Sequence, residues 1–350
     1  MARSPILVGT LLAAAAAVVF GVTTPFIQRL GSGVGPFSTA ALLYVGAALG
    51  SLSWRGRGVE FRETRVARRH LPRLLAVAFF GAALAPALFT WGLQRVPATY
   101  GSLLLNGEAV FTVLLAAAIH REHVGLRVAI AVALMLAGGA VTMNGAAATG
   151  TVGLLGAAAI VGAVLSWALD NVLTRPFADL DPTEVVRFNA ACGAALTAVL
   201  AVLVGEPLPS LARMTGLLLC GATGYGVSLR LYLLAQRRIG AGRTGSVFAV
   251  APFVGASAAI LLGDRPGGAT TVVAGLLFVG GLALHISERH GHLHTHEALS
   301  HDHAHAHDDG HHDHHHDGPM AGPHAHPHAH AAAIHAHPHG PDSHHGHSHR

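Results

Sequence analysis

The chain has 350 residues, of which 51% are hydrophobic and only 11% are charged, against about 25% charged in an ordinary soluble domain. Its 22 basic residues are all Arg, which excludes the Lys of a Walker A loop and the Lys of Schiff-base enzymes. The arginines lie in short loops between apolar runs rather than in a basic patch with aromatic residues. This pattern is typical of membrane topology and excludes nucleic acid as a partner.

Ten apolar runs follow one another along residues 1–289, each about long enough to cross a bilayer core of ~30 Å at ~1.5 Å per residue. We therefore predict an all-α polytopic membrane protein with ten transmembrane helices in contact with the lipid bilayer. The predicted spans are residues 6–28, 37–54, 73–93, 97–119, 125–144, 152–174, 185–204, 212–235, 244–262 and 268–287.

The arginines between these spans predict the orientation of the chain. Seven of them, from Arg55 to Arg73, lie in the loop between the second and third spans. The loops that would face the opposite side hold only Arg29, Arg95, Arg213 and Arg265. Because positive charge accumulates on the cytoplasmic side, we expect both termini in the cytoplasm and the protein in the cytoplasmic (inner) membrane.

An internal repeat divides the membrane part into two halves of five spans. Gly101-Ser102, at the start of the fourth span, matches Gly245-Ser246, at the start of the ninth. An odd number of spans per copy places the two copies in opposite orientations, as in many secondary transporters. The predicted units are residues 1–146, residues 147–289 and a histidine-rich tail over 290–350.

Three segments carry a resemblance to a known family: SWALDNVLTR (166–175), GYGVSLRLYLLAQRRIGAGRTGSVFAVAPFVGA (224–256) and SERHGHLHTHEALSHDH (287–303). With the ten spans, they resemble the EamA-type drug/metabolite transporter superfamily, in a ten-helix exporter branch with a histidine-rich C-terminal tail. The resemblance implies secondary transport, usually export of small metabolites or toxic compounds, coupled to protons or to exchange. It does not define a substrate.

Glu108 is the first candidate for a coupling residue, because it lies near the middle of the fourth predicted span. An isolated ionised carboxylate there costs ~2.5–3.5 kcal/mol on insertion scales, so it must be protonated, paired or facing water. Gly101, Leu105, Glu108 and Thr112 follow helical spacing, which predicts one polar face toward a central site. The alternative is a satisfied hydrogen bond between helices.

Asp170 and Asn171 extend a polar stripe near the end of the sixth predicted span. Ser166 and Trp167 precede them by four residues each, so the four side chains share one part of a helix surface. A substrate contact and a helix-end hydrogen-bond cluster are both compatible with this pattern.

Arg230 lies deeper in the eighth predicted span, with Tyr225, Ser228 and Tyr232 at helical spacing beside it. A guanidinium there could pair with Glu108 or bind a substrate carboxylate. The alternative is that its side chain extends to the membrane interface. Glu108, Asp170, Asn171, Tyr225, Arg230 and Tyr232 are thus the predicted substrate and coupling residues.

The tail holds 24 of the 28 histidines, mostly alternating with Ala, Gly, Pro or Asp. Imidazole binds Zn²⁺, Ni²⁺, Co²⁺ and Cu²⁺, whereas this composition offers no apolar core, so we expect a disordered metal-binding segment. No cofactor is required. The candidate metal ligands are His292, His294, His296, His301, His303, His305, His307, His311, His312, His314, His315 and His316.

Three functions remain open from the sequence. The first is an exporter of a small organic metabolite or toxin with Glu108 as the coupling group. The second is a divalent-metal exporter, and the third is a membrane protein that senses or stores metal without flux. An enzyme is not expected, because the spans contain neither a nucleophile–base pair nor a closed metal triad. The substrate, the coupling ion and the presence of a homodimer stay open.

Overall fold

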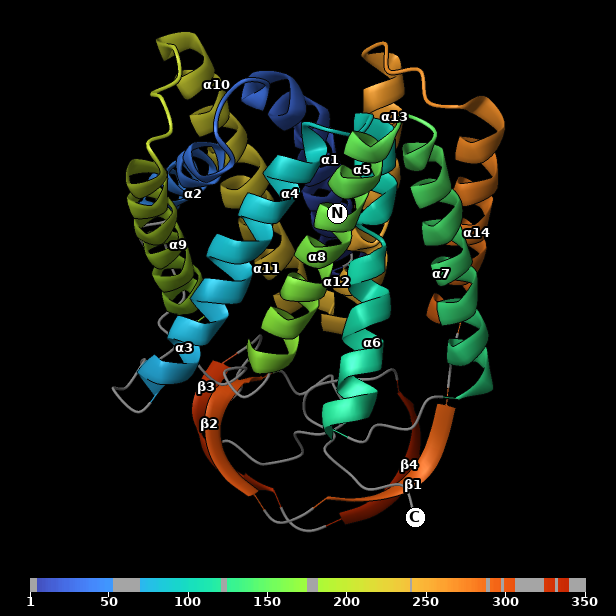
Figure 1. The fold of residues 1–350 in the computed structure, drawn as a ribbon. Coiled ribbons are helices and arrows are strands. Elements are labelled where there is room, and N and C mark those ends of the chain that lie inside the picture. Colours follow the sequence, from blue (N-terminus) through green and yellow to red (C-terminus); the bar gives the residue numbers. More distant parts are fainter. Residues whose placement is uncertain are drawn as a thin grey trace.

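The computed structural model describes residues 5–52, 70–120, 125–174, 182–239 and 241–287, and the backbone of four tail segments, 290–296, 299–305, 324–330 and 333–339. Within these residues, nine helical spans are long and apolar enough to cross a membrane, and a shorter apolar helix covers Pro36–Ser51. Nine of the ten predicted spans are therefore confirmed, and the second is present as a shorter apolar helix. The helices run side by side as one bundle (Figure 1).

The first half contains α1 (Pro5–Gly31), α2 (Pro36–Leu52), α3 (Leu71–Val77), η2 (Ala78–Leu84), α4 (Ala85–Leu93), α5 (Ala98–Leu104), α6 (Gly107–His120) and α7 (Leu126–Ala147). The second half contains α8 (Thr151–Thr174), α9 (Pro182–Val204), α10 (Leu211–Cys220), η4 (Gly221–Val227), α11 (Ser228–Ile239), α12 (Ala241–Phe248), α13 (Ala251–Leu261) and α14 (Gly268–Ile286). Each half thus has its third span interrupted by a π-helical segment and its fourth span divided into two helices.

The fourth span of each half breaks for a local chemical reason. Between α5 and α6, the side-chain amide of Asn106 donates to the Leu103 carbonyl oxygen at 2.9 Å and so competes with the helix ladder. Between α12 and α13, Pro252 lies in the first turn of α13, where it lacks an N–H and restricts the residue before it. The expected continuous helix linking Gly101 to Glu108 was therefore wrong, since the two residues lie in different helices.

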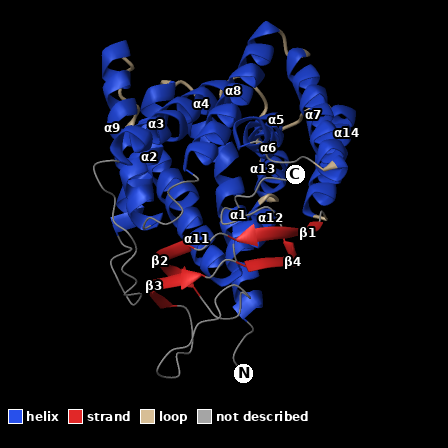
Figure 2. Ribbon diagram, turned by 90° about the horizontal axis from the view of Figure 1, so that it is seen from below, coloured by secondary structure: helices blue, strands red, loops and turns tan. Residues whose placement is uncertain are grey.

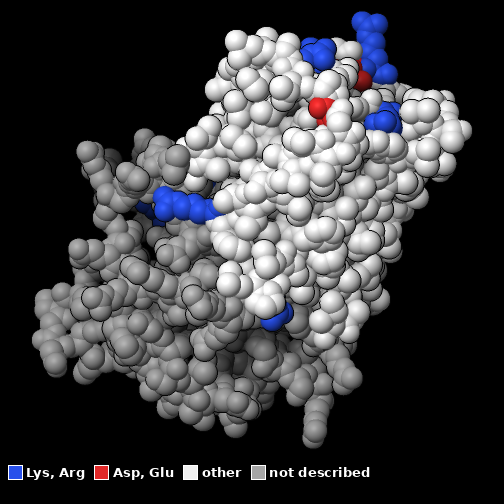
Figure 3. All heavy atoms as spheres, turned by 60° about the vertical axis from the view of Figure 1, so that its left-hand side comes forward, with Lys and Arg blue, Asp and Glu red and all other residues white. Residues whose placement is uncertain are grey.

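Small residues fill the interior while larger aliphatic side chains face outward. Because Gly46 and Gly221 have no side chains, the backbone of α2 contacts the backbone of the span that contains η4. Val202 and Leu261 are 79% and 86% exposed on the outer surface. Figure 3 shows the resulting broad uncharged surface, with the described charged residues mainly toward its ends.

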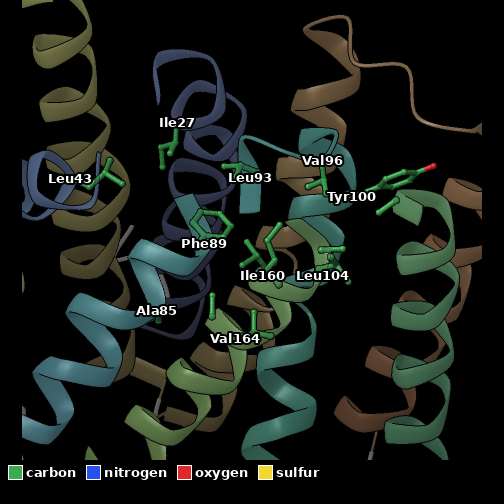
Figure 4. Close-up of a cluster of buried hydrophobic side chains, with 14 of the residues drawn as sticks. Ile27, Leu43, Ala85, Phe89, Leu93, Val96, Tyr100, Leu104, Ile160 and Val164 are labelled. Atoms are coloured by element: carbon green, nitrogen blue, oxygen red, sulfur yellow. The ribbon is translucent and has the colours of Figure 1, made fainter. Parts of the chain in front are cut away.

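The largest buried cluster lies where α1, α4, α5 and α8 meet (Figure 4). Phe89 and Ile160 form its centre and are 1% and 0% exposed. Trp167 and Tyr225 pack against this cluster from one side. The apolar cluster thereby provides a rigid support behind two residues of the candidate site.

Four tail segments form two antiparallel ribbons (Figure 2). β1 (His290–His296) pairs with β4 (Ala333–His339), and β2 (Leu299–His305) pairs with β3 (His324–His330). In these segments the structure differs from the irregular chain that composition predicted, because an alternating sequence also has the period of two residues of a β-strand. The other tail residues lie outside the described part of the chain.

Candidate functional site

Glu108 lies in the first turn of α6, immediately after the break in the fourth span. The side-chain amide of Asn171, on α8, donates to the Glu108 carboxylate at 2.9 Å and lies 3.5 Å from the Thr112 hydroxyl. Glu108 is half-buried and Asn171 is exposed. The positive end of the α6 helix dipole also favours a carboxylate there, as at half-helix ends in other membrane proteins.

Asp170, one residue before Asn171, lies against the π-helical segment η2. The Thr174 hydroxyl donates to its carboxylate at 3.2 Å. A Cβ atom on Gly81 would overlap this carboxylate, so the glycine makes room for it. The structure thus brings together Glu108, Thr112, Asp170, Asn171 and Thr174, which we call the polar cluster.

The carbonyl of Gly81 joins the polar cluster to two aromatic side chains. It accepts hydrogen bonds from the Tyr44 hydroxyl and from the Trp167 indole nitrogen, each at 3.0 Å. Pro86, in the first turn of α4, lacks the N–H that would continue the helix ladder beside this segment. Such π-helical turns occur often at functional sites, and here the buried Gly81 carbonyl positions Tyr44 and Trp167.

A continuous series of five aromatic rings, which we call the ring chain, lies beside the polar cluster. Neighbouring ring centroids are 5.7 Å apart for Tyr44 and Tyr225, 5.8 Å for Tyr225 and Phe20, 5.6 Å for Phe20 and Phe248, and 5.1 Å for Phe248 and Tyr232. All five side chains are half-buried. Tyr44 of the ring chain and Asp170 of the polar cluster both lie against Gly81, so the ring chain and the polar cluster adjoin there.

The predicted residues on the eighth span divide between different surroundings. Tyr225 lies in η4 and Tyr232 in α11, and both belong to the ring chain. Ser228 is buried and donates to the Ala16 carbonyl oxygen at 2.9 Å, so it contributes to helix packing instead. Arg230 is exposed on α11, and its pairing with Glu108 stays a prediction.

Three site residues were missed by the sequence analysis: Tyr44, Phe20 and Phe248. One signal was available for Tyr44, because the whole chain has only 4 tyrosines and an apolar span rarely needs a hydroxyl. The phenylalanines carry no such signal, since any apolar span contains residues of this kind. Their ring contacts come from α1 and α12, which are far apart in sequence.

The opposite end of the bundle holds the turns at 31–36, 148–151, 205–210 and 262–268, and we call it the turn end. Asp264 accepts hydrogen bonds there from the Thr99 N–H at 2.9 Å and the Thr99 hydroxyl at 2.8 Å, at the start of α5. Glu206 accepts from the N–H groups of Phe37 and Ser38 at 3.1 and 2.6 Å, at the start of α2. Carboxylates from the second half thus cap helices of the first half and join the two halves at the turn end.

The residues whose side chains the structure describes contain no group of three or more His, Cys, Asp or Glu that could hold a metal ion. In the tail, the backbone register places His292 opposite His337, His294 opposite His335, and His303 opposite His326. Similar pairs join His301 to His328 and His305 to His324. His307, His311, His312, His314, His315 and His316 lie outside the described residues.

The fold and the site define a class: a polytopic helical membrane protein with a polar site between two five-span halves. Comparison with known proteins agrees with this class and identifies a family within it. The EamA-like transporter family matches residues 7–144 and again residues 154–286. The chain belongs to this family.

A relative and a solved structure resemble the chain over most of its length. An uncharacterized transporter of Methanothermobacter thermautotrophicus is 25% identical over 290 residues, which cover 76% of this chain and 82% of the relative. A protein of known crystal structure superposes with a TM-score of 0.58 at 22% identity, over 81% of this chain and 96% of the other. The first supports a transporter, and the second shows the shared fold.

Proposed function

We propose that this membrane transporter exports a small organic molecule across the cytoplasmic membrane in exchange for protons, with both termini in the cytoplasm. The single observation that carries the proposal is the position of Glu108. Its half-buried carboxylate lies at the start of a half-helix and receives a hydrogen bond from Asn171 of the other half. Such a carboxyl is stable when ionised and hydrogen-bonded, and also when protonated, which is what proton exchange requires.

The closed turn end supports a cycle of alternating access. In this structure the helix caps of Asp264 and Glu206 join the two halves at one end, while Asn171 is exposed. Opening would exchange these caps for water and expose the Glu108 carboxyl to the opposite compartment. A proton bound on one side would then be released on the other, and substrate would move in the opposite direction.

The test measures proton movement in proteoliposomes that contain a pH-sensitive dye. Amines, amino acids and nucleosides are added one at a time to find compounds that drive proton flux through the wild type. We expect Glu108→Gln to abolish this flux, because an amide cannot release a proton. Glu108→Asp is the matched control, since it keeps a carboxyl that can bind and release a proton at the same position and should retain part of the flux.

A result against the proposal is equally clear. If proton-linked flux of an active compound persists in Glu108→Gln, then Glu108 is not the coupling group. If substrate moves with no proton flux in the wild type, the proposal of exchange with protons is wrong, and the protein transports its substrate by facilitated diffusion.

We infer for the tail a separate role as a ligand for divalent metal, and the backbone register favours it. His294 and His335 are register partners in the antiparallel pair, and residues at directly opposite positions of such a pair lie close together in general. Two imidazoles at that spacing suit Zn²⁺, Ni²⁺, Co²⁺ or Cu²⁺. In this interpretation the tail senses or buffers metal, whereas in the competing one it delivers metal to be exported.

Radioactive nickel, cobalt and zinc in inverted vesicles separate the two interpretations. The full chain is compared with a version that ends at Arg289. We expect metal binding that disappears with the tail and does not respond to a pH gradient. Accumulation driven by the gradient, and persisting without the tail, would instead make metal the cargo.

A further inference from the structure

The tail strands pair histidines from two parts of the sequence that lie far apart. β1 and β2 belong to residues 290–305, whereas β3 and β4 belong to residues 324–339. If one counts inward from the pair His290–His339, one residue at a time on each strand, the count reaches the pair Leu299–His330 without a gap or an insertion. The two ribbons (Figure 2) therefore share the register of a single antiparallel pair.

The phase of the histidine repeat matches this register in both ribbons. Histidines occupy even-numbered positions in β1 and β3 and odd-numbered positions in β2 and β4. Because the register joins each even-numbered residue to an odd-numbered one, histidine meets histidine in both ribbons. A shift of the register by one residue would place another residue type opposite every histidine of these pairs. The six pairs are His290–His339, His292–His337, His294–His335, His301–His328, His303–His326 and His305–His324.

Three neighbouring histidine pairs share one face of each ribbon, because alternate residues of a strand lie on the same face. Alternate residues are about 6.6–6.8 Å apart along a strand, and directly opposite residues of an antiparallel pair have Cα atoms about 4.5–5.5 Å apart. The backbone thus places four histidines of two neighbouring pairs at the corners of a small rectangle. Zn²⁺ prefers four ligands in a tetrahedron, and four neutral imidazoles can supply them.

The strands offer little other stabilisation to hold the ribbons together. An isolated two-stranded ribbon is marginally stable at best in water, and Gly291, Pro327 and Pro338 weaken these strands further. Where the ligand set is complete only in the folded chain, the free energy of metal binding stabilises the fold. Metal ligation is therefore the interaction best able to hold this register.

We propose that the tail forms two metal sites of the tetrahedral zinc class, one in each ribbon, each made of two neighbouring histidine pairs, and that metal thereby folds the two distant parts of the tail together. This inference rests on the proposed role of the tail as a metal ligand, and it names the histidines that act together. Any two neighbouring pairs of a ribbon include the central pair. His292–His337 and His303–His326 therefore belong to the sites in every case.

The proposed ligands differ from the set that the sequence alone favoured. Half of them come from β3 and β4, which the sequence-based set did not include. His296 leaves the set, because its register partner is Ala333. A flexible chain that chelates metal with any nearby histidines would instead make β3 and β4 dispensable.

Zinc binding to the purified full-length protein distinguishes these two possibilities. The number of ions and their affinity are measured by competition with a chromogenic chelator, and the full chain is compared with a version that ends at Gly322. That version keeps His292 to His316 but lacks β3 and β4. We expect two tightly bound ions in the full chain and an affinity weaker by about tenfold or more in the shortened version, because each site loses two ligands. Equal number and affinity in the two proteins would overturn the proposal.

Single substitutions locate the ligands within a ribbon. His337→Ala should weaken the binding of one of the two ions by about tenfold or more, because the central pair belongs to every possible site. His339→Ala should weaken it by about threefold or less, since the pair His294–His335 can still complete the site. His347→Ala is the matched control, because His347 follows the last strand. Equal effects of His337→Ala and His347→Ala would reject the paired sites.

Double substitutions separate the two ribbons. His292→Ala combined with His337→Ala should affect the same single ion that either change affects alone, because the two residues are register partners. His292→Ala combined with His326→Ala should weaken both ions, because His326 belongs to the other ribbon. The proposal fails if both combinations weaken both ions.

Cobalt reports the coordination geometry without any variant. Tetrahedral Co²⁺ absorbs visible light strongly, whereas octahedral Co²⁺ absorbs it weakly, and Co²⁺ binds the same imidazole ligands as Zn²⁺. We expect the strong spectrum in the full chain and its loss in the version that ends at Gly322. A weak spectrum in the full chain at saturation would reject sites of four histidines.

Spin labels test whether metal folds the tail. Nitroxide labels are attached at Thr295 and Ile334, which are register partners between the histidine pairs, in a protein whose native Cys192 and Cys220 are replaced by alanine. Zinc should convert a broad distribution of distances between the labels into a narrow one at short distance. A distribution that stays broad when zinc is bound would overturn the proposed folding.

Failure of this inference is separable from failure of the proposed role of the tail. Zinc that binds equally to the full chain and to the version ending at Gly322, but not to the version ending at Arg289, would keep the tail as a metal ligand and reject the paired sites. Zinc binding that is unchanged in the version ending at Arg289 would reject both. Neither result affects the proton flux expected of Glu108.

Discussion

Gly81 positions three side chains of the site although it has no side chain of its own. Its carbonyl binds Tyr44 and Trp167, and its missing side chain leaves space for the carboxylate of Asp170. One backbone position therefore orients two aromatic residues and one acid. Composition could not reveal this, because the chain contains 43 glycines, most of which can serve helix packing alone.

Gly81→Ala is expected to impair transport. The new Cβ would overlap the Asp170 carboxylate, which is short and cannot move away without leaving Thr174. Overpacking of this kind costs typically about 1–3 kcal/mol of stability, measurable as a lower melting temperature of the purified protein. Gly139→Ala is the matched control, since a Cβ at Gly139 meets nothing within 4 Å, and unchanged flux in Gly81→Ala would contradict the role given to this position.

Asp264→Ala is expected to loosen the turn end. The substitution removes both hydrogen bonds to Thr99 at the start of α5. Loss of a helix cap costs typically about 1 kcal/mol. Hydrogen exchange of the amides at the start of α5 should therefore accelerate by about fivefold, as about 1 kcal/mol corresponds to at 25 °C. Asp264→Asn, which keeps an oxygen acceptor, should show a smaller change. Equal protection of these amides in the wild type and both variants would show that Asp264 does not stabilise the start of α5.

At the scale of the elements, the two halves repeat their irregularities as well as their helices. The third span contains η2 in the first half and η4 in the second, and the fourth span is divided in both. These interruptions carry Gly81, Glu108 and Tyr225. Hydropathy and length predicted the spans, because a bilayer demands about 20 apolar residues wherever they lie. They could not predict the interruptions, since a π turn or a break leaves the hydropathy of a span unchanged.

Deleting Thr223 tests whether the π-helical form of η4 matters. A π turn holds one residue more than an α turn, so the deletion should convert η4 to regular helix. Alternatively it would rotate α11 by about 100°, the angle per residue of an α-helix, and separate Tyr232 from Phe248. Either change displaces a ring, and we expect loss of transport with normal membrane insertion. Thr223→Ala keeps the chain length and should transport normally. Full transport activity of the deletion variant would show that the π-helical form of η4 is not needed for transport.

The whole molecule combines two halves of five spans each, and an even number of spans requires both termini on the same side of the membrane. The arginine distribution predicts that this side is the cytoplasm. We expect a protease-sensitive tag at either terminus to be digested in inverted vesicles and protected in intact spheroplasts. Digestion of one tag alone would contradict an even number of spans.

The membrane class, the spans, the two halves and five residues of the site could be predicted from the sequence alone: Glu108, Asp170, Asn171, Tyr225 and Tyr232. Each follows from chain-local properties: the cost of moving polar groups into lipid, the length of a span, and the rarity of an acid within it. The tertiary structure alone decided that Glu108 meets Asn171 across the halves, that Gly81 makes room for Asp170, and that five rings join into one chain. These contacts depend on how helices distant in sequence pack together, and small residues permit that packing in many arrangements without specifying one.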